Sequence, residues 1–294
     1  REERTDHGVR ADIGALVALD TVLDLPLGDI HGDAALLVLG GAGGHAAVHG
    51  ERGHGQLVAF PTETVYGLGA NALDAKAVLN IFAAKGRPAD NPLIVHVYDR
   101  AQLTPLCEVS PLAEKLMDAF WPGPLTLILP RKSAIPDEVA ASLPTVAVRM
   151  PSHPVAAALL RACKLPIAAP SANRSGKPSP TTAHHVLVDM DGRIPLILDG
   201  GSCDVGVEST VLDVTSGAPC ILRPGGITKD MLESVLGHVD VAGSVLRPLQ
   251  KGEKALSPGM RYKHYSPDGQ VTLVEGTEAD VVAAMAKLAA HADA

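Results

Sequence analysis

Short apolar runs alternate with segments of helical periodicity between residues 57 and 236, and this alternation limits the possible fold more than any other feature. The run Leu57–Phe60 is followed by a loop rich in hydroxyls and glycines, Pro61–Gly69. Asp74–Lys85 then places apolar residues at i, i+3 and i+4, as an amphipathic helix does, and Leu93–Tyr98 is apolar again. The order strand, loop, helix, strand predicts an α/β domain with a mixed, largely covered sheet.

The same alternation continues to residue 236. Ser110-Pro111 is a typical helix start, and that helix should end before the Trp-Pro-Gly-Pro sequence at 121–124. Two more helices are expected at Pro154–Arg161 and Thr228–Leu236. Further strands are expected at Leu125–Leu129, Thr145–Met150, Pro166–Ala169, Ile194–Leu198, Thr210–Val214 and Cys220–Leu222.

The pattern divides the chain into four parts. Residues 1–54 lack Lys, Ser, Asn, Cys, Met and every aromatic residue, so we interpret them as an atypical, low-information N-terminal extension. Residues 55–240 are the expected main domain. Residues 241–269 lose the periodicity and read as an ordered interdomain linker. Residues 270–294 contain a strand pattern at Gln270–Glu275 and a helix pattern at Glu278–His291, which we expect to be the start of a truncated second α/β domain or a short βα appendage.

Composition excludes some classes of function. The net charge is -8 and the isoelectric point is about 5.8, which argues against broad electrostatic capture of nucleic acid but permits a local basic pocket. The four cysteines form no CxxC pair and no zinc-type spacing, so we expect reduced thiols. No apolar run approaches the ~20 residues of a membrane span. We therefore expect a cytoplasmic protein away from the membrane, without excluding an organelle.

Cationic and small polar residues gather at the predicted strand ends. Lys85 and Arg87 close a helix, which by itself is explained by C-terminal capping. However, Arg149 ends one strand, and further polar residues follow three others: Ser171 and Asn173, Ser209, and Arg223. Open α/β sheets build ligand sites at such strand ends. Several fixed donors at one sheet edge suit a small polar substrate beside a polyphosphate.

Other motif readings fit less well. No GxxxxGK[ST] phosphate loop occurs, and two glycine-rich stretches at residues 41–46 and 67–72 lack the tight strand-to-helix turn of a dinucleotide fingerprint. A serine hydrolase using Ser171 with His184 or His185 would need a GxSxG nucleophile elbow, which is not present around Ser171.

Seven motifs together resemble a known family, the YrdC-like threonylcarbamoyl-AMP synthases, in both order and spacing. They are PTETVYGLG (61–69), Lys85-x-Arg87 with NPLIVH (91–96), PGPLT (122–126), TVAVRMP (145–151), PSAN (170–173), GVEST (206–210) and LRPG (222–225). In addition, SPGMRYKHYSP (257–267) resembles the interdomain linker of the long, two-domain members.

The resemblance implies a fold and an activity. The fold is a twisted, open mixed sheet with flanking helices and a basic concave groove. The activity is that of a nucleotidyltransferase, which makes L-threonylcarbamoyladenylate and pyrophosphate from L-threonine, bicarbonate and ATP. Mg²⁺ accompanies the ATP, and no tightly bound organic cofactor is expected. The product passes to a tRNA threonylcarbamoyl transferase for threonylcarbamoyladenosine formation in tRNA.

The resemblance also implies expected roles for individual residues. The catalytic set is Lys85, Arg87, Ser171 and Asn173. The threonine-binding set is Thr64, His96, Arg149, Ala169 and Ser209, with Arg149 pairing the substrate carboxylate. The ATP-binding set is Arg87, Asn91, Thr145, Ser171, Ser179, Arg223 and Tyr265, the last reaching the site from the linker. No resident metal site is expected.

Two other functions stay open from the sequence. Some YrdC-like domains are associated with RNA through their basic groove, so an RNA-binding module without turnover is the main alternative, although tRNA binding is not expected as the primary activity. A carbamoyl-transfer domain of hydrogenase-maturation type shares the fold, but such proteins carry zinc-finger segments and this chain has no CxxC.

Overall fold

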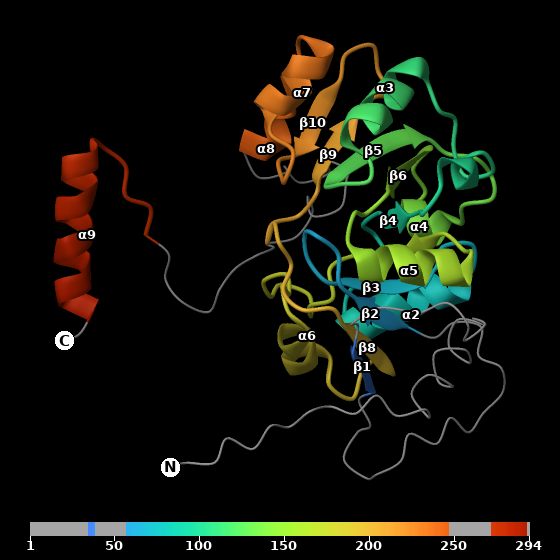
Figure 1. Ribbon diagram of the computed structural model, residues 1–294, viewed down its shortest axis with the longest axis horizontal. Coiled ribbons are helices and arrows are strands. Elements are labelled where there is room, and N and C mark those ends of the chain that lie inside the picture. Colours follow the sequence, from blue (N-terminus) through green and yellow to red (C-terminus); the bar gives the residue numbers. More distant parts are fainter. Residues whose placement is uncertain (1–34, 39–56, 247–271, 293–294) are drawn as a thin grey trace.

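The computed structural model describes residues 35–38, 57–246 and 272–292. Within them, strands and helices alternate much as the sequence predicts (Figure 1). The expected α/β class with a mixed, twisted open sheet and flanking helices is confirmed. In these ranges no helix combines the length and the apolar character needed to cross a membrane.

One sheet contains all of the strands in the described residues, in the order β1-β8-β2-β3-β7-β4-β6-β5-β9-β10-β11. Parallel and antiparallel pairs both occur: β4 and β6 run parallel, while β5 and β6 run antiparallel. The strands are β1 Ala35–Val38, β2 Val58–Phe60, β3 Gly67–Asn71, β4 Ile94–His96, β5 Leu125–Pro130, β6 Thr145–Arg149, β7 Ile167–Ala168, β8 Leu196–Asp199, β9 Thr210–Asp213, β10 Cys220–Arg223 and β11 Asp240–Val241.

Helices flank this sheet. They are α2 Ala75–Lys85, the 3-10 helix η1 Arg100–Leu103, α3 Pro111–Phe120, α4 Asp137–Ala140, α5 Pro154–Cys163, α6 Ala183–Met190, α7 Lys229–Leu236 and α8 Gly243–Leu246. A further helix, α9 Glu278–Ala292, follows near the end of the chain. The predicted caps are present: the side chains of Asp74, Ser110 and Thr228 accept backbone N–H groups at the starts of α2, α3 and α7. These local signals explain why the helix positions were readable from the sequence.

Strand β3 lies partly inside the segment that the sequence assigns to a loop, so the prediction of a loop over Pro61–Gly69 is wrong at its end. Residue Gly67 pairs with Phe60 across an antiparallel hairpin. A Cβ atom on Gly69 would lie 2.7 Å from Ile167 Cγ2, so a side chain at this position would collide with β7. Glycine suggested a loop in the sequence, whereas here it permits the close approach of two strands.

Several further elements differ from the sequence expectations. Helix α6 and the short elements η1, α4, β11 and α8 were not predicted, and α8 lies inside the linker expected at residues 241–269. Strand β1 falls inside the predicted N-terminal extension and pairs antiparallel with β8. The strand expected over Gln270–Glu275 is not formed at residues 272–275, the part of it that the structure describes, whereas the helix after it is confirmed as α9.

Alternation along β2 sends its side chains into different core layers. Ala59 belongs to the large core cluster that includes α2 and α3, while Val58 and Phe60 pack with α5 in a second cluster. A third, smaller cluster includes Ile94 of β4. Helix α5 therefore covers part of the second face of the sheet, and a pocket is lined by Ala169 of the second cluster and Ile94 of the third.

Candidate active site

A pocket that is partly open to solvent lies where several strand ends and loops meet. The loop between β2 and β3, the ends of β4, β6 and β10, the segment after β7 and the loop before β9 all contribute to it. The lining residues are Thr62, Thr64, Val65, Gly67, Arg87, Ile94, His96, Arg149, Ala169, Pro170, Ser171, Glu208, Ser209 and Arg223.

The register of two parallel strands sets the floor of this pocket. His96 of β4 lies beside Arg149 of β6, and Ile94 lies beside Ala147. Because side chains alternate along a strand, Ile94 and His96 share one face, and both line the pocket. An imidazole and a guanidinium from neighbouring strands are thereby placed together, as the sequence motifs suggested.

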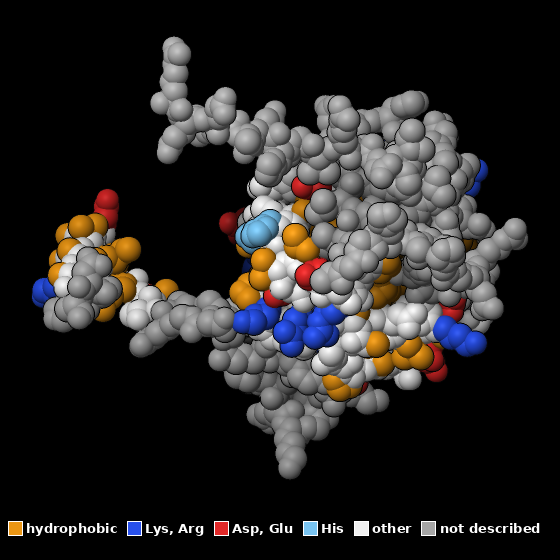
Figure 2. Space-filling model, turned by 90° about the horizontal axis from the view of Figure 1, so that it is seen from below, with side chains coloured by type: hydrophobic (Ala, Val, Ile, Leu, Met, Phe, Trp, Pro, Cys, Tyr) orange, Lys and Arg blue, Asp and Glu red, His pale blue; other side chains and the backbone are white. Residues whose placement is uncertain are grey.

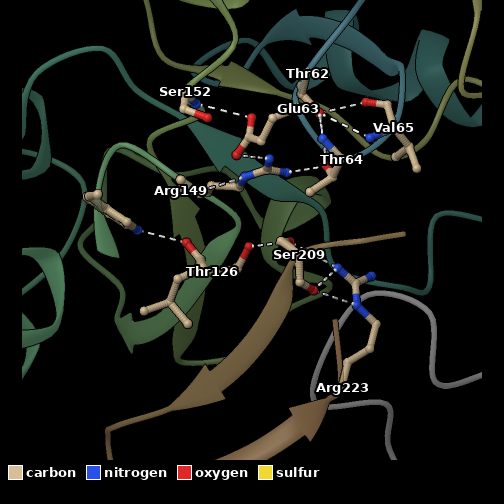
Figure 3. Close-up of polar contacts among 12 residues, drawn as sticks. Thr62, Glu63, Thr64, Val65, Thr126, Arg149, Ser152, Ser209 and Arg223 are labelled. Atoms are coloured by element: carbon tan, nitrogen blue, oxygen red, sulfur yellow. Dashed lines mark hydrogen bonds and ion pairs between the residues drawn. The ribbon is translucent and has the colours of Figure 1, made fainter. Parts of the chain in front are cut away.

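Arg149 is held by buried partners. Its side chain is only 4% exposed, and one terminal nitrogen lies 2.6 Å from Glu63 Oε1 (Figure 3). The other terminal nitrogen donates to Thr64 Oγ1 at 2.9 Å, and Nε donates to the Gly123 carbonyl at 3.3 Å. Burial lowers the pKa of the Arg149 guanidinium, and the Glu63 carboxylate acts in the opposite direction. The result is a fixed cation at the pocket wall.

A second group of polar contacts surrounds Ser209. Its hydroxyl lies 2.7 Å from Thr126 Oγ1, and it accepts a hydrogen bond from Arg223 at 3.2 Å (Figure 3). Arg223 also donates from two nitrogens to the Ser209 carbonyl, at 2.9 and 3.2 Å. Thr126 is fully buried on β5, so its hydroxyl holds the Ser209 side chain from the interior of the protein. Arg223 is thus oriented from β10 toward the strand end of β9.

His96 is neutral in this environment. It is 3% exposed, and its ring meets the Phe60 ring edge-on with the centroids 5.9 Å apart. Burial first, and then the charge of Arg149, lower the pKa of His96 to about 3. Nδ1 is buried and has no hydrogen-bond partner among the residues that the structure describes. A neutral imidazole with an unsatisfied nitrogen is well suited to hydrogen-bond a polar ligand.

Lys85 acts on the neighbouring loop. Its ammonium donates to the carbonyls of Ser171 and Asn173 and is 4% exposed, and burial lowers its pKa well below the usual range. The Ser171 hydroxyl donates to Asn173 Oδ1, and the Asn173 amide donates to the carbonyls of Arg174 and Lys177. Together these contacts set the shape of the loop that presents Ser171 to the pocket.

The pocket gathers most of the predicted site residues. All five members of the threonine-binding set line it, as do Arg87, Ser171 and Arg223 of the ATP-binding set. The remaining ones are not in its lining: Lys85, Asn91, Asn173, Thr145 and Ser179. Tyr265 lies outside the described residues.

Two of these outlying residues still carry buried, unsatisfied groups. Asn91 is fully buried, and neither of its side-chain amide atoms has a hydrogen-bond partner in the described part of the chain. The Ser179 hydroxyl is also buried and has no hydrogen-bond partner in the described part of the chain. Unsatisfied buried polar atoms are uncommon and suit a ligand contact. Thr145, by contrast, begins β6 at the end opposite Arg149.

Sequence reasoning missed several residues at the site. Thr62 and Glu208 line the pocket, and Glu63 and Thr126 hold lining residues in place. Each of these residues lies in or next to one of the seven motifs, so its closeness to a predicted site residue in the sequence was the available signal. Glu208 is the carboxylate of the lining, and its Oε1 is buried without a described partner.

Charge distinguishes this pocket from the molecule as a whole. The lining contains Arg87, Arg149 and Arg223 against the single carboxylate of Glu208, whereas the whole chain has a net charge of -8. Basic side chains also gather on part of the face seen in Figure 2. No cluster of three or more His, Cys, Asp or Glu side chains that could hold a metal occurs in the ranges described. A divalent ion brought by a phosphate ligand could meet Glu208.

The sequence of this chain matches two known family models. Residues 52–225 match the Sua5/YciO/YrdC family model, which is described as "Telomere recombination". The chain belongs to this family. Residues 227–294 of this Sua5/YrdC-type chain match a second model, described as "Threonylcarbamoyl-AMP synthase, C-terminal domain". The family resemblance inferred from the motifs is confirmed.

Individual relatives agree with that assignment. Proteins named threonylcarbamoyl-AMP synthase from Pyrococcus abyssi and Bacillus subtilis are 54% and 57% identical over 76% of this chain. The chain spans 65% and 64% of the length of these relatives. A crystal structure of P. abyssi Sua5 complexed with L-threonine matches with a TM-score of 0.78 at 51% identity, covering 81% of this chain and 70% of that one.

Proposed function

We propose that this chain is a threonylcarbamoyl-AMP synthase, which makes L-threonylcarbamoyladenylate and pyrophosphate from L-threonine, bicarbonate and ATP. The observation that carries the proposal is the convergence of the five expected threonine-binding residues on one pocket, with two further arginines in the same lining. The names of the relatives and the L-threonine in the P. abyssi structure support it.

The pocket offers a contact for each part of the amino acid. Arg149 is a fixed guanidinium that can take the carboxylate, because a guanidinium matches a carboxylate with two parallel hydrogen bonds. Thr64 and Ser209 offer hydroxyls to a polar side chain, and Ala169 offers an apolar surface to a methyl group. His96 supplies a neutral nitrogen rather than a third charge.

Phosphate binding falls to the other cations. Arg87 and Arg223 line the same pocket, as does Ser171, whose backbone carbonyl accepts a hydrogen bond from Lys85. The amine of threonine adds to carbon dioxide with loss of a proton, or to bicarbonate with loss of water, to give a carbamate. A carbamate oxygen then displaces pyrophosphate from the α-phosphorus of ATP. Such a step depends mainly on positioning and charge neutralisation, so no protein nucleophile is required.

Mg²⁺ is expected to enter with ATP, where it would neutralise phosphate charge. Glu208 is the pocket carboxylate that could contact it, because Mg²⁺ is usually bound by one or two carboxylates together with substrate phosphates. Asn91, Asn173, Thr145 and Ser179 stay predictions for the nucleotide site.

The wider biological role is proposed with the activity. The product is a reactive mixed anhydride, and it would pass to a tRNA threonylcarbamoyl transferase. We also propose that residues 55–240 form the catalytic unit, that residues 241–269 form a linker bringing Tyr265 to the nucleotide, and that residues 270–294 belong to a second α/β domain. The match of residues 227–294 to the C-terminal family model supports a second domain at this end of the chain, and the matched range begins before the proposed boundary at residue 240.

The test is pyrophosphate release from ATP with Mg²⁺, measured with and without L-threonine and bicarbonate. We expect release only when both are present, and a loss of about 30- to 1,000-fold in Arg87→Ala, because one charged donor to the transition state is worth about 2–4 kcal/mol. Folded protein without threonine-dependent release would contradict the synthase. Salt-sensitive RNA binding by that same protein would instead favour the RNA-binding alternative.

A further inference from the structure

Glu63 is a buried carboxylate beside the pocket that belongs to neither the threonine-binding set nor the ATP-binding set. Its side chain is 7% exposed and does not line the pocket. A carboxylate withdrawn from water in this way loses its hydration and must be compensated by hydrogen bonds or an opposite charge. The partners of Glu63 therefore show what it stabilises.

Three chain segments meet at Glu63. Its Oε1 lies 2.6 Å from a terminal nitrogen of Arg149, at the end of β6. Its Oε2 accepts the backbone N–H of Ser152 at 3.1 Å, in the turn before α5 (Figure 3). Its backbone carbonyl accepts the N–H of Val205 at 2.8 Å, in the loop that leads to Ser209. One residue thus ties together three segments around the pocket.

The contacts of Arg149 show how Glu63 could influence ligand binding without touching the ligand. Each of its three guanidinium nitrogens has one partner: Glu63, Thr64 Oγ1 and the Gly123 carbonyl. Glu63 is the charged one among them, and its carboxylate is itself held by the Ser152 N–H, so it anchors the buried guanidinium at this position. A guanidinium has five N–H groups, so donors are left over for a bidentate ligand carboxylate.

We propose that Glu63 is a positioning residue for amino-acid binding, which acts by holding Arg149 in the orientation that a substrate carboxylate requires. This inference rests on the proposed function for the identity of the amino acid. Glu63 does not touch the substrate in this arrangement. Its removal should weaken threonine binding through the misplaced guanidinium, and it should leave ATP binding at Arg87 and Arg223 nearly unchanged.

The experiment compares Glu63→Gln and Glu63→Asp with the wild type. Threonine affinity is measured by calorimetry, KM values for threonine and ATP by pyrophosphate release, and Tm by scanning calorimetry. For Glu63→Gln we expect a threonine Kd and KM about 10- to 100-fold higher, as for a misplaced binding group, and an ATP KM within about 3-fold of the wild type. Glu63→Asp keeps the charge and should recover part of the threonine affinity, and it also provides the test if Glu63→Gln does not fold.

A matched control and a double-mutant cycle separate positioning from general stability. Glu233→Gln removes a carboxylate from an exposed pair with Lys229 and should change no kinetic constant. In an Arg149→Lys background, Glu63→Gln should have a much smaller effect on threonine affinity, because the two residues act through one contact.

Several outcomes would overturn the proposal. These are unchanged or tighter threonine binding in folded Glu63→Gln, equal changes in the KM of both substrates, or additive effects in the cycle. Wild-type protein that binds no threonine would overturn it together with the proposed function. Wild-type protein that binds threonine in a Glu63-dependent way but releases no pyrophosphate would refute the synthase alone.

Discussion

At the scale of single residues, the site uses burial to decide which groups carry charge. Arg149 keeps its charge inside the protein because Glu63 lies 2.6 Å away, whereas His96 next to it is held neutral. A second cation so close to Arg149 would be costly in a medium of low dielectric constant. This part of the pocket is therefore built from one fixed cation and a neutral imidazole, not from two competing positive charges.

This neutral state of His96 predicts a pH dependence of stability. The pKa of His96 is lowered to about 3 in the folded protein, whereas an unfolded chain titrates near 6.5. Between these values the unfolded state binds the proton and the folded state does not, so the free energy of unfolding falls as the pH falls from about 6.5 toward 3. This contribution should be on the order of 1–4 kcal/mol and fully present above pH 6.5.

The measurement is chemical denaturation of the wild type and of His96→Gln from pH 7.5 to pH 4. The variant should have a smaller slope of stability against pH in this window, whatever its stability at neutral pH. His184→Gln, at an exposed position of α6, is the control and should keep the wild-type slope. A wild-type slope in His96→Gln would show that His96 is not held neutral.

At the scale of elements, the C-terminal end of α2 positions two cationic residues of the site, Lys85 and Arg87. Asp74 caps its start by accepting the N–H groups of Lys76 and Ala77. Gly86 ends the helix in the left-handed region, with φ of 67°, and its N–H returns to the carbonyls of Ala83 and Phe82. This turn directs Lys85 into the Ser171 loop and Arg87 toward the pocket, so the helix end is part of the site.

Replacing Gly86 should therefore weaken both stability and activity. Gly86→Ala forces a side chain into a left-handed conformation and should cost about 1 kcal/mol of stability, although no atom would collide with the new Cβ. Thermal unfolding and the ATP KM should both change, because Lys85 and Arg87 flank the turn. Gly217→Ala, in an open loop without a positive φ, should change neither, and equal behaviour of the two variants would argue against strain at Gly86.

At the scale of the whole molecule, the pocket forms where segments that are far apart in the sequence pack in close backbone contact. The turn after β10 packs onto the loop before β9, where Gly226 donates its N–H to the Glu208 carbonyl at 3.0 Å. A Cβ atom on Gly225 would lie 2.2 Å from that carbonyl oxygen and 2.5 Å from the Thr210 nitrogen. The obstacles are backbone atoms, so they cannot move aside cheaply.

Gly225→Ala should consequently displace one wall of the pocket. We expect a loss of about 2 kcal/mol or more in the free energy of unfolding, together with weaker threonine and ATP binding, because the segments carrying Ser209 and Arg223 must separate. Denaturation and calorimetric binding measure these effects. Gly243→Ala has open space around its Cβ and serves as the control, and wild-type stability in Gly225→Ala would contradict this close packing.

Much of the fold was readable from the sequence because its signals are local. The caps at Asp74, Ser110 and Thr228 and the short apolar runs each lie within a few residues, and the structure places helices and strands there. Where a signal was ambiguous, the prediction was wrong: the glycines of β3 suggested a loop. Nothing within residues 61–69 specifies the packing of β3 against Phe60 and Ile167.

The sequence by itself determined which residue types are available for chemistry, and seven ordered motifs named most residues of the pocket. Tertiary structure alone decided how these residues are used. Lys85 became a donor to loop carbonyls, and Glu63 became the counter-charge of Arg149 across a separation of 86 residues in the chain. Charge pairing, burial and the pKa of His96 depend on groups that only folding brings together, and for that reason no local pattern could reveal them.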